Sequence, residues 1–204
     1  MKIKAINFRN TYLNDREVKG LIILLSLFAA GMILGAGMWR TDNQNVTIMN
    51  NLFNELINYR NNLSFFDIFC NSFIFNFAVM FLVIFFGYSP IGSVFVSTIP
   101  LIRGLCYGIL SGYLYSLHKL QGVGYYLLTV LPSALLINIC IIIASNNACF
   151  LSVDILSVIM NKMNSDKLQV NKNLKINIVC IVICVISAIF RSVTIKTFSY
   201  LFQF

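Results

Sequence analysis

Charge is scarce in this sequence of 204 residues. Only 11% of the residues are charged, whereas 58% are hydrophobic and the mean hydropathy is +0.81. A soluble domain carries about 25% charged residues, so there is too little charge here to cover a surface that faces water. The deficit excludes an ordinary soluble protein and predicts an integral membrane protein, embedded in a lipid bilayer.

Acidic residues and histidine are scarcer still, with seven Asp and Glu in total and one His. All seven acids lie in loops or beside the apolar segments, and His118 stands next to Lys119 in a short polar link. An intramembrane protease needs paired aspartates, a Ser–His pair or a metal motif, and a proton-coupled carrier uses intramembrane acids. The sequence therefore predicts neither an enzyme nor a charge-driven transporter, and no cofactor.

The basic residues and the cysteines do not predict a nucleic-acid site or a metal site. The net charge of +8 comes without a basic run interleaved with aromatics, so no nucleic-acid partner is expected. The six cysteines contain no paired C-x-x-C. Cys180 and Cys184 are one helical turn apart, a spacing compatible with a metal, but no His or acid is near them in sequence. We expect buried small hydrophobes and no metal.

Long apolar runs are what the sequence has instead. About 20 helical residues cross a hydrocarbon core of about 30 Å, and five segments suffice: 20–39, 68–86, 98–117, 123–144 and 174–190. Between them lie an external loop over residues 40–67, with the periodicity of an amphipathic helix, and a cytoplasmic loop over residues 145–173. The sequence thus predicts one all-α integral membrane domain over residues 1–204.

Residues 148–160 are a sixth apolar stretch, too short to cross the bilayer alone. Residues 145–147 are polar and separate it from the fourth span, and a polar stripe follows at helical spacing: Asp154, Ser157, Asn161 and Ser165. This pattern predicts an amphipathic helix on the membrane surface.

The placement of Lys and Arg predicts the orientation. With Arg103 set aside, nine basic residues lie before the first span or in the loop before the fifth, and five lie on the opposite side. The bias predicts a cytoplasmic N-terminus and an external C-terminus.

Glycines at four-residue spacing mark two of the spans. Gly104, Gly108 and Gly112 share one face of the third, and Gly31 and Gly35 form a shorter notch on the first. In lipid, small residues at this spacing let two helix backbones approach closely, so we expect close helix packing at both sets.

Arg103 is the one charge inside an apolar span, and two interpretations remain open. In the favoured one, Pro100 breaks the helix, residues 91–99 lie at the inner interface, and Arg103 anchors to headgroups. In the other, the arginine is buried and bonded to freed carbonyls or to Asn76 or Asn138. Pro132 is a second predicted helix break, in the fourth span.

Several of these residues occur in an order that resembles the stage II sporulation protein M family: Arg103-Gly104, Gly108, Gly112, a short link with Gly122, then Leu131-Pro132. The chain also resembles this family in its length, its five predicted spans and its basic N-terminus. The resemblance therefore covers nearly the whole chain. Broader relatives often carry a His-Gly pair and a Glu after that proline. Residues 133–136 read Ser-Ala-Leu-Leu here, which argues against inheriting their chemistry.

The resemblance implies a scaffold in the mother-cell septal or engulfing membrane of a bacterium that forms endospores. Family members are thought to join two peptidoglycan-degrading partners, sporulation proteins D and P, in septal thinning and engulfment. The competing interpretation is a small transport component, a permease subunit or channel, for which a deeply buried Arg103 and two broken helices would be the support. Self-association of the chain stays open.

Overall fold

The computed structural model describes residues 15–38, 64–160 and 170–198, and every element in them is a helix. These are α1 (Asp15–Met38), α3 (Phe65–Gly87), α4 (Gly92–Tyr125), the π-helical turn η2 (Tyr126–Val130), α5 (Leu131–Ile159) and α6 (Val170–Phe198). Within these described residues, five stretches are long and apolar enough to cross a membrane: Glu17–Met38, Phe65–Gly87, Gly92–Ser116, Lys119–Ile159 and Asn173–Thr197. The prediction of an all-α chain with five such helices is confirmed.

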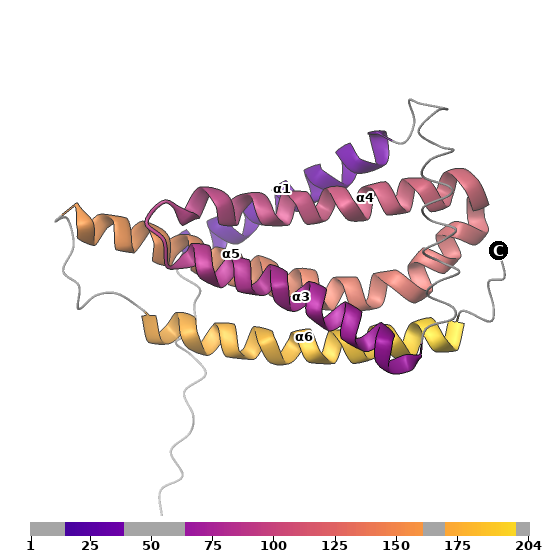
Figure 1. Cartoon of the computed structure of the whole chain (residues 1–204). Helices are drawn as coiled ribbons and strands as arrows, with labels where there is room; N and C mark the ends of the chain where they lie inside the picture. The colour runs from indigo at the N-terminus through magenta and orange to yellow at the C-terminus, as the bar shows by residue number, and fades with distance from the viewer. Residues whose placement is uncertain (1–14, 39–63, 161–169, 199–204) are drawn as a thin grey trace, which may run out of the picture.

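The helices lie side by side and alternate in direction along one long axis (Figure 1). The main core joins four of them, α3 to α6, and contains Met80, Val83, Val96, Ile141 and Cys184, all almost fully buried. Helix α1 is not part of this core. It crosses α4 and packs mainly on that helix, as the indigo ribbon in Figure 1 shows.

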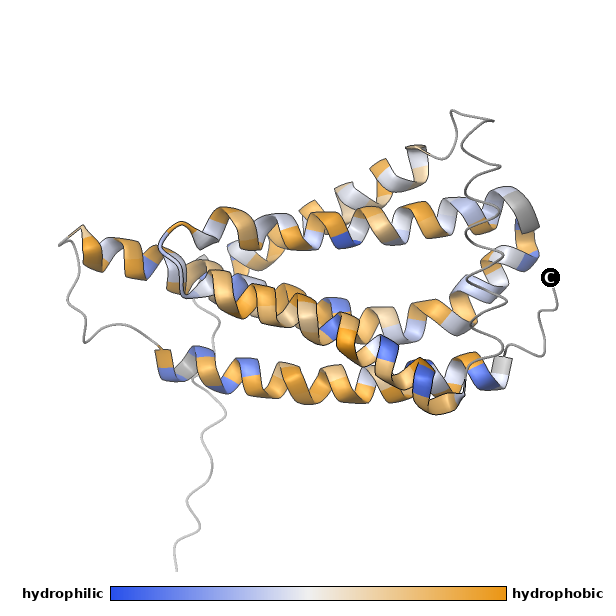
Figure 2. Cartoon of the chain, viewed as in Figure 1, coloured by the Kyte–Doolittle hydropathy of each residue, from blue (hydrophilic) through white to orange (hydrophobic). Residues whose placement is uncertain are grey.

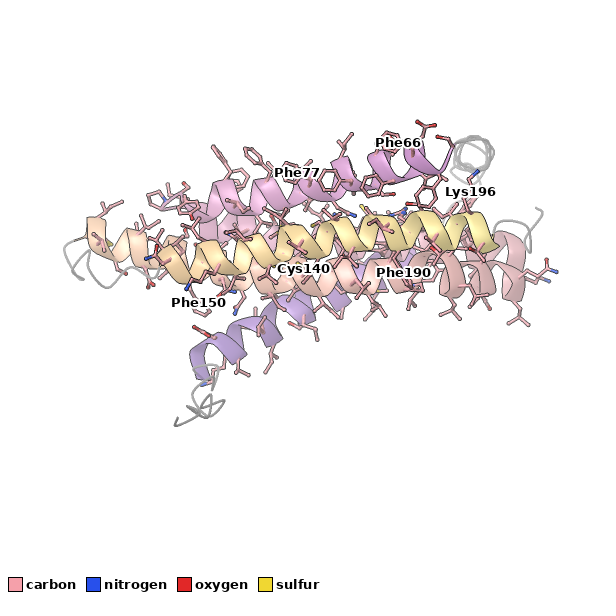
Figure 3. All side chains as sticks on the ribbon, turned by 90° about the horizontal axis from the view of Figure 1, so that it is seen from below. Phe66, Phe77, Cys140, Phe150, Phe190 and Lys196 are labelled. Carbon is pink, nitrogen blue, oxygen red and sulfur yellow. The ribbon has the colours of Figure 1, made fainter. Side chains whose placement is uncertain are left out.

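Apolar side chains also cover the outside of the bundle. Hydropathy colouring shows mostly hydrophobic ribbon, with hydrophilic residues gathered at the two ends of α6 (Figure 2). On α3, Phe66 and Phe77 point away from the bundle (Figure 3) and are 69% and 40% exposed. Phe73 stacks on both Phe69 and Phe77, with ring centroids 6.0 and 5.6 Å apart. In water such a surface would be unstable, whereas in lipid it needs no cover.

Helix α3 begins with a capping box formed by Ser64 and Asp67, inside the stretch predicted as external loop. The Ser64 side chain accepts from the backbone N–H of Asp67, and the Asp67 carboxylate accepts from the backbone N–H of Ser64. This exchange satisfies two of the free N–H groups at a helix start. The amphipathic helix predicted within residues 40–67 otherwise lies outside the described residues.

The chain reverses between the third and fourth spans at Lys119, inside the predicted link at residues 118–122. Lys119 has φ 47° and ψ −123°, outside the helical region, and two helices meet there. Figure 1 shows this turn near the end of α4, from which the chain returns as α5. A residue with positive φ stops the helical hydrogen-bond pattern, so this residue forms the corner.

The predicted helix break at Pro100 is wrong. Helix α4 begins at Gly92 and continues through Pro100, which is fully buried. In the preceding turn, Ser97 Oγ donates to the Ser93 carbonyl at 2.8 Å and Thr98 Oγ donates to the Phe95 carbonyl at 2.7 Å. Neither bond reaches the Val96 carbonyl, which loses its helical donor at Pro100. Membrane helices tolerate proline where neighbouring helices pack around it. Pro100 is buried in the bundle and α4 continues through it, so no separate interfacial segment forms over 91–99.

The separate surface helix predicted over residues 148–160 is also wrong, and the predicted loop over 145–173 is correspondingly shorter. Helix α5 runs without interruption to Ile159. The polar residues expected to end it are bonded instead: Asn147 Nδ2 donates to the Ile143 carbonyl at 2.8 Å, and Asn146 Nδ2 donates to the Glu17 carbonyl of α1 at 3.1 Å. Because these amides find acceptors, the helix does not stop at them.

Candidate functional site

Four of the predicted glycines, two on α1 and two on α4, lie in one backbone-to-backbone contact. A Cβ atom on Gly108 would overlap the Met32 carbonyl oxygen and lie 3.0 Å from the Ala36 nitrogen. A Cβ on Gly31 would likewise overlap the Leu101 carbonyl. Gly35 and Gly104 are equally confined, by Leu105 and Phe28 respectively, and Gly112, one turn beyond Gly108, is half-buried. Only glycine lets the two backbones come this close. In lipid no hydrophobic effect drives helices together, so the dispersion contacts made at this short distance hold them.

Arg103 lies on α4, where its guanidinium joins three helices. Its Nη2 donates to Asn76 Oδ1 of α3 at 2.9 Å, and its Nη1 donates to Asn138 Oδ1 of α5 at 3.4 Å. Each of the three side chains is at least nine-tenths buried, with exposures of 6%, 3% and 7% for Arg103, Asn76 and Asn138. The Phe75 ring covers the guanidinium, with 5.5 Å from Cζ to the ring centroid, within cation–π range. We call these three polar residues the arginine centre.

The sequence of each helix explains why the arginine centre forms. Asn76 falls on the inward stripe of α3, which repeats roughly every four residues: Ile68, Ser72, Asn76, Met80, Val83 and Gly87. On α5, Asn138 follows the buried Ala134 and Ile137. Because α4 is continuous through Pro100, Arg103 stays on a packed helix and projects between the other two. The headgroup-anchor interpretation favoured from the sequence is therefore wrong, and the structure has the buried alternative, with both asparagines as partners.

The chemistry of the arginine centre is that of a positive charge held by neutral acceptors. Of the five N–H donors of a guanidinium, two meet amide oxygens, and Nε has no hydrogen-bond partner among the described residues. A charge inside a span costs at least about 2.5–3.5 kcal/mol on insertion scales. The arrangement ties α3, α4 and α5 together and keeps one buried donor open for an acceptor.

Pro132 lies at a different irregularity, directly after the π-helical turn η2 and near the start of α5. Proline lacks an N–H, and its ring clashes with the carbonyl four residues earlier. The chain accommodates it by widening the preceding turn, so the helix changes its pitch there and does not end. Thr194 of α6 donates to the Thr129 carbonyl in this turn at 3.3 Å and so connects it to the bundle.

The cysteines singled out by spacing are core residues. Cys180 and Cys184 are 3% and 0% exposed and belong to the main core together with Cys140. The Cys140 thiol points at the Cys180 carbonyl, with 3.5 Å from Sγ to O, and the reverse contact is 3.7 Å. These contacts join α5 to α6.

Sequence reasoning missed Ser152, which holds the turn between α3 and α4. Its Oγ accepts from the Ser93 backbone N–H at 2.9 Å and donates to the Ser89 carbonyl at 2.7 Å. Ser152 is fully buried on the extension of α5. The sequence does not reveal the role of a single serine in an apolar run, because that role depends on a turn about 60 residues earlier in the chain.

Together, the apolar exterior, the five long helices and the buried arginine centre define a polytopic membrane protein with a tightly packed helical bundle. Residues 23–192 match the family described as Stage II sporulation protein M, and the chain belongs to that family. It is therefore a sporulation-related membrane protein. No curated protein and no solved structure matches the chain.

Proposed function

We propose that the protein is a non-catalytic membrane scaffold for a peptidoglycan-degrading complex in septal thinning and engulfment during endospore formation. Family membership over residues 23–192 is the observation that carries the proposal. The proposed partners are the sporulation cell-wall hydrolases, stage II sporulation proteins D and P. The proposed location is the mother-cell septal and engulfing membrane.

The bundle supports this role because its helices are fixed to one another by two kinds of contact. The arginine centre links α3, α4 and α5, and the glycine contact fixes α1 on α4. Helices fixed in this way can hold two partners at a constant separation, which is what a scaffold needs. The arginine centre contributes a cation and two amides, groups that position helices and lack a nucleophile.

A second candidate, a small membrane transport component, is favoured by the burial of Arg103. Charged residues inside spans mark substrate or ion pathways in many transporters, and the Nε–H group of Arg103 is open. The predicted helix break at Pro100 does not support this candidate, because α4 continues through that residue.

Crosslinking and pull-down from cells at the engulfment stage separates the two candidates. We expect a tagged chain to recover the wall hydrolases, and vegetative cells expressing the same tagged chain serve as the control. Recovery of transporter ATPases in place of hydrolases would favour the transport component. Hydrolysis of purified peptidoglycan by the isolated protein would contradict the non-catalytic role.

A further inference from the structure

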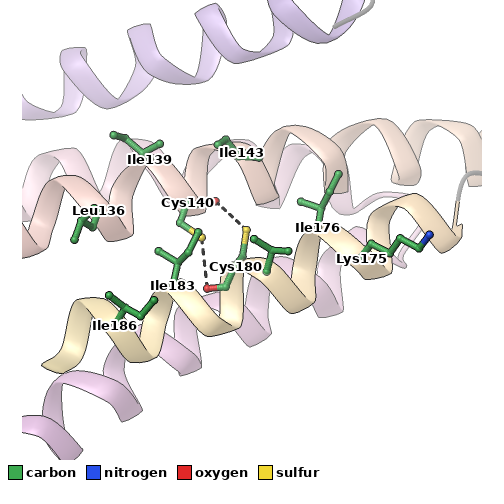
Figure 4. Close-up of a pocket in the computed structure, with 10 residues that line it drawn as sticks. Leu136, Ile139, Cys140, Ile143, Lys175, Ile176, Cys180, Ile183 and Ile186 are labelled. Carbon is green, nitrogen blue, oxygen red and sulfur yellow. Dashed lines mark hydrogen bonds between the residues drawn. The ribbon is translucent and has the colours of Figure 1, made fainter. Parts of the chain in front are cut away.

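A groove of about 540 Å³ runs between α5 and α6 on the outside of the bundle (Figure 4). Aliphatic side chains line both walls: Leu136, Ile139 and Ile143 of α5, with Val179, Ile183 and Ile186 of α6. The volume lies in the range of small-molecule sites. Both helices belong to the spans, so the groove faces the membrane.

The floor of the groove contains the two cysteines that join α5 to α6. Each thiol is directed at the carbonyl oxygen of the other residue, as the dashed lines in Figure 4 show. Both cysteines are buried, at 2% and 3% exposure. The polar atoms at the floor therefore satisfy one another, and an occupant meets carbon surface almost everywhere.

One end of the groove differs, because it carries a positive charge. Lys175 is exposed and lies at this end, near the start of α6 (Figure 4). Its position is two residues inside the apolar span, which starts at Asn173. An ammonium at this depth lies at the boundary between hydrocarbon and headgroups.

The length of the groove decides between possible occupants. From Lys175 to Ile186 the helix rises about 17 Å, at about 1.5 Å per residue, which is roughly half of a hydrocarbon core of about 30 Å. A transmembrane helix of a partner or of a second copy needs a groove along the whole span. A single acyl chain needs one leaflet, with its phosphate at the interface.

We propose that this groove binds one acyl chain of an anionic phospholipid, with the lipid phosphate at Lys175. Basic residues at the ends of clefts between membrane helices bind anionic headgroups. Zwitterionic lipids fit the apolar groove equally well, but their own cation offsets the attraction to lysine, so the site selects negative lipids.

Native mass spectrometry of the full chain in detergent, titrated with phosphatidylglycerol or phosphatidylcholine, tests the proposal. We expect the wild type to retain phosphatidylglycerol preferentially. Lys175→Gln should reduce that preference about fivefold, the equivalent of about 1 kcal/mol per basic residue at an anionic surface. Lys19→Gln, an exposed lysine of α1, is the matched control and should leave the preference unchanged.

A second pair of variants tests the groove itself. Val179→Trp fills it and should abolish retention of both lipids, whereas Val182→Trp changes an exposed residue of α6 outside the groove and should have no effect. Equal retention of the two lipids by the wild type would overturn the charge recognition. A dimer that Val179→Trp dissociates would show that a second copy occupies the groove, and would also overturn the proposal. Lys175→Gln changes only an exposed side chain, so it tests the recognition of negative lipids even if Val179→Trp does not fold.

Discussion

Replacing Gly35 with alanine puts a methyl group into the contact between α1 and α4. The new Cβ would overlap the Leu105 carbonyl oxygen and lie 2.9 Å from the Ile109 backbone nitrogen. Ordinary van der Waals contact begins at 3.4 Å, so the helices must separate by at least 0.5 Å, the difference between these two values. Backbone atoms cannot move aside as a flexible side chain can, and the whole interface has to open.

The energetic cost follows from that separation. A gap of about 0.5–1 Å forfeits a quarter to a half of the dispersion attraction at each contact, and overpacking costs roughly 1–3 kcal/mol. Alanine recovers up to about 1 kcal/mol through its helix propensity. We therefore expect Gly35→Ala to lower the free energy of unfolding by about 1–2 kcal/mol.

Gly37 gives a matched control on the same helix, two residues away, because a Cβ there meets nothing within 4 Å. Gly37→Ala should leave the free energy of unfolding unchanged or raise it by up to about 1 kcal/mol. Unfolding by sodium dodecyl sulfate in mixed micelles, followed by far-UV circular dichroism, measures both variants. Equal stability of the two variants would show that the glycines of α1 do not form a tight contact with α4.

Three further predictions concern the arginine centre, the turn and the orientation. Arg103→Lys replaces a planar fork with a compact charge that cannot bond both amides, so it should lower the free energy of unfolding by about 1.5–3 kcal/mol; unchanged stability would revive the headgroup anchor. Ser152→Ala should lower the free energy of unfolding by about 1–3 kcal/mol in the same assay, because two backbone groups lose a partner. The control Ser157→Ala should change it by no more than about 0.5 kcal/mol, because this hydroxyl bonds only within its own helix. A reporter at Ala5 should be cytoplasmic and one at Phe204 external; both on one side would contradict an odd number of spans.

The sequence alone determined the number of spans, the helical class and the faces that carry glycine. Each is a local property: a run of about 20 apolar residues has to be helical in lipid whatever its neighbours are, because its backbone has no other hydrogen-bond partners. Glycines four residues apart share a face on any helix. The end of α5 is not a local property of this kind, because the polar residues 145–147 do not end the helix.

Only the tertiary structure decided what the polar residues and prolines do. Pro100 and the polar residues 145–147 predict helix ends, but both helices continue through them. Pro100 is buried in the bundle, Asn146 donates to α1, and Asn147 donates within its own helix. Arg103 lies in the bundle because Asn76 and Asn138, on two other helices, face it there. Whether a polar group ends a helix, reaches a headgroup or is buried depends on which acceptors lie within about 3 Å of it, and those acceptors are distant in sequence.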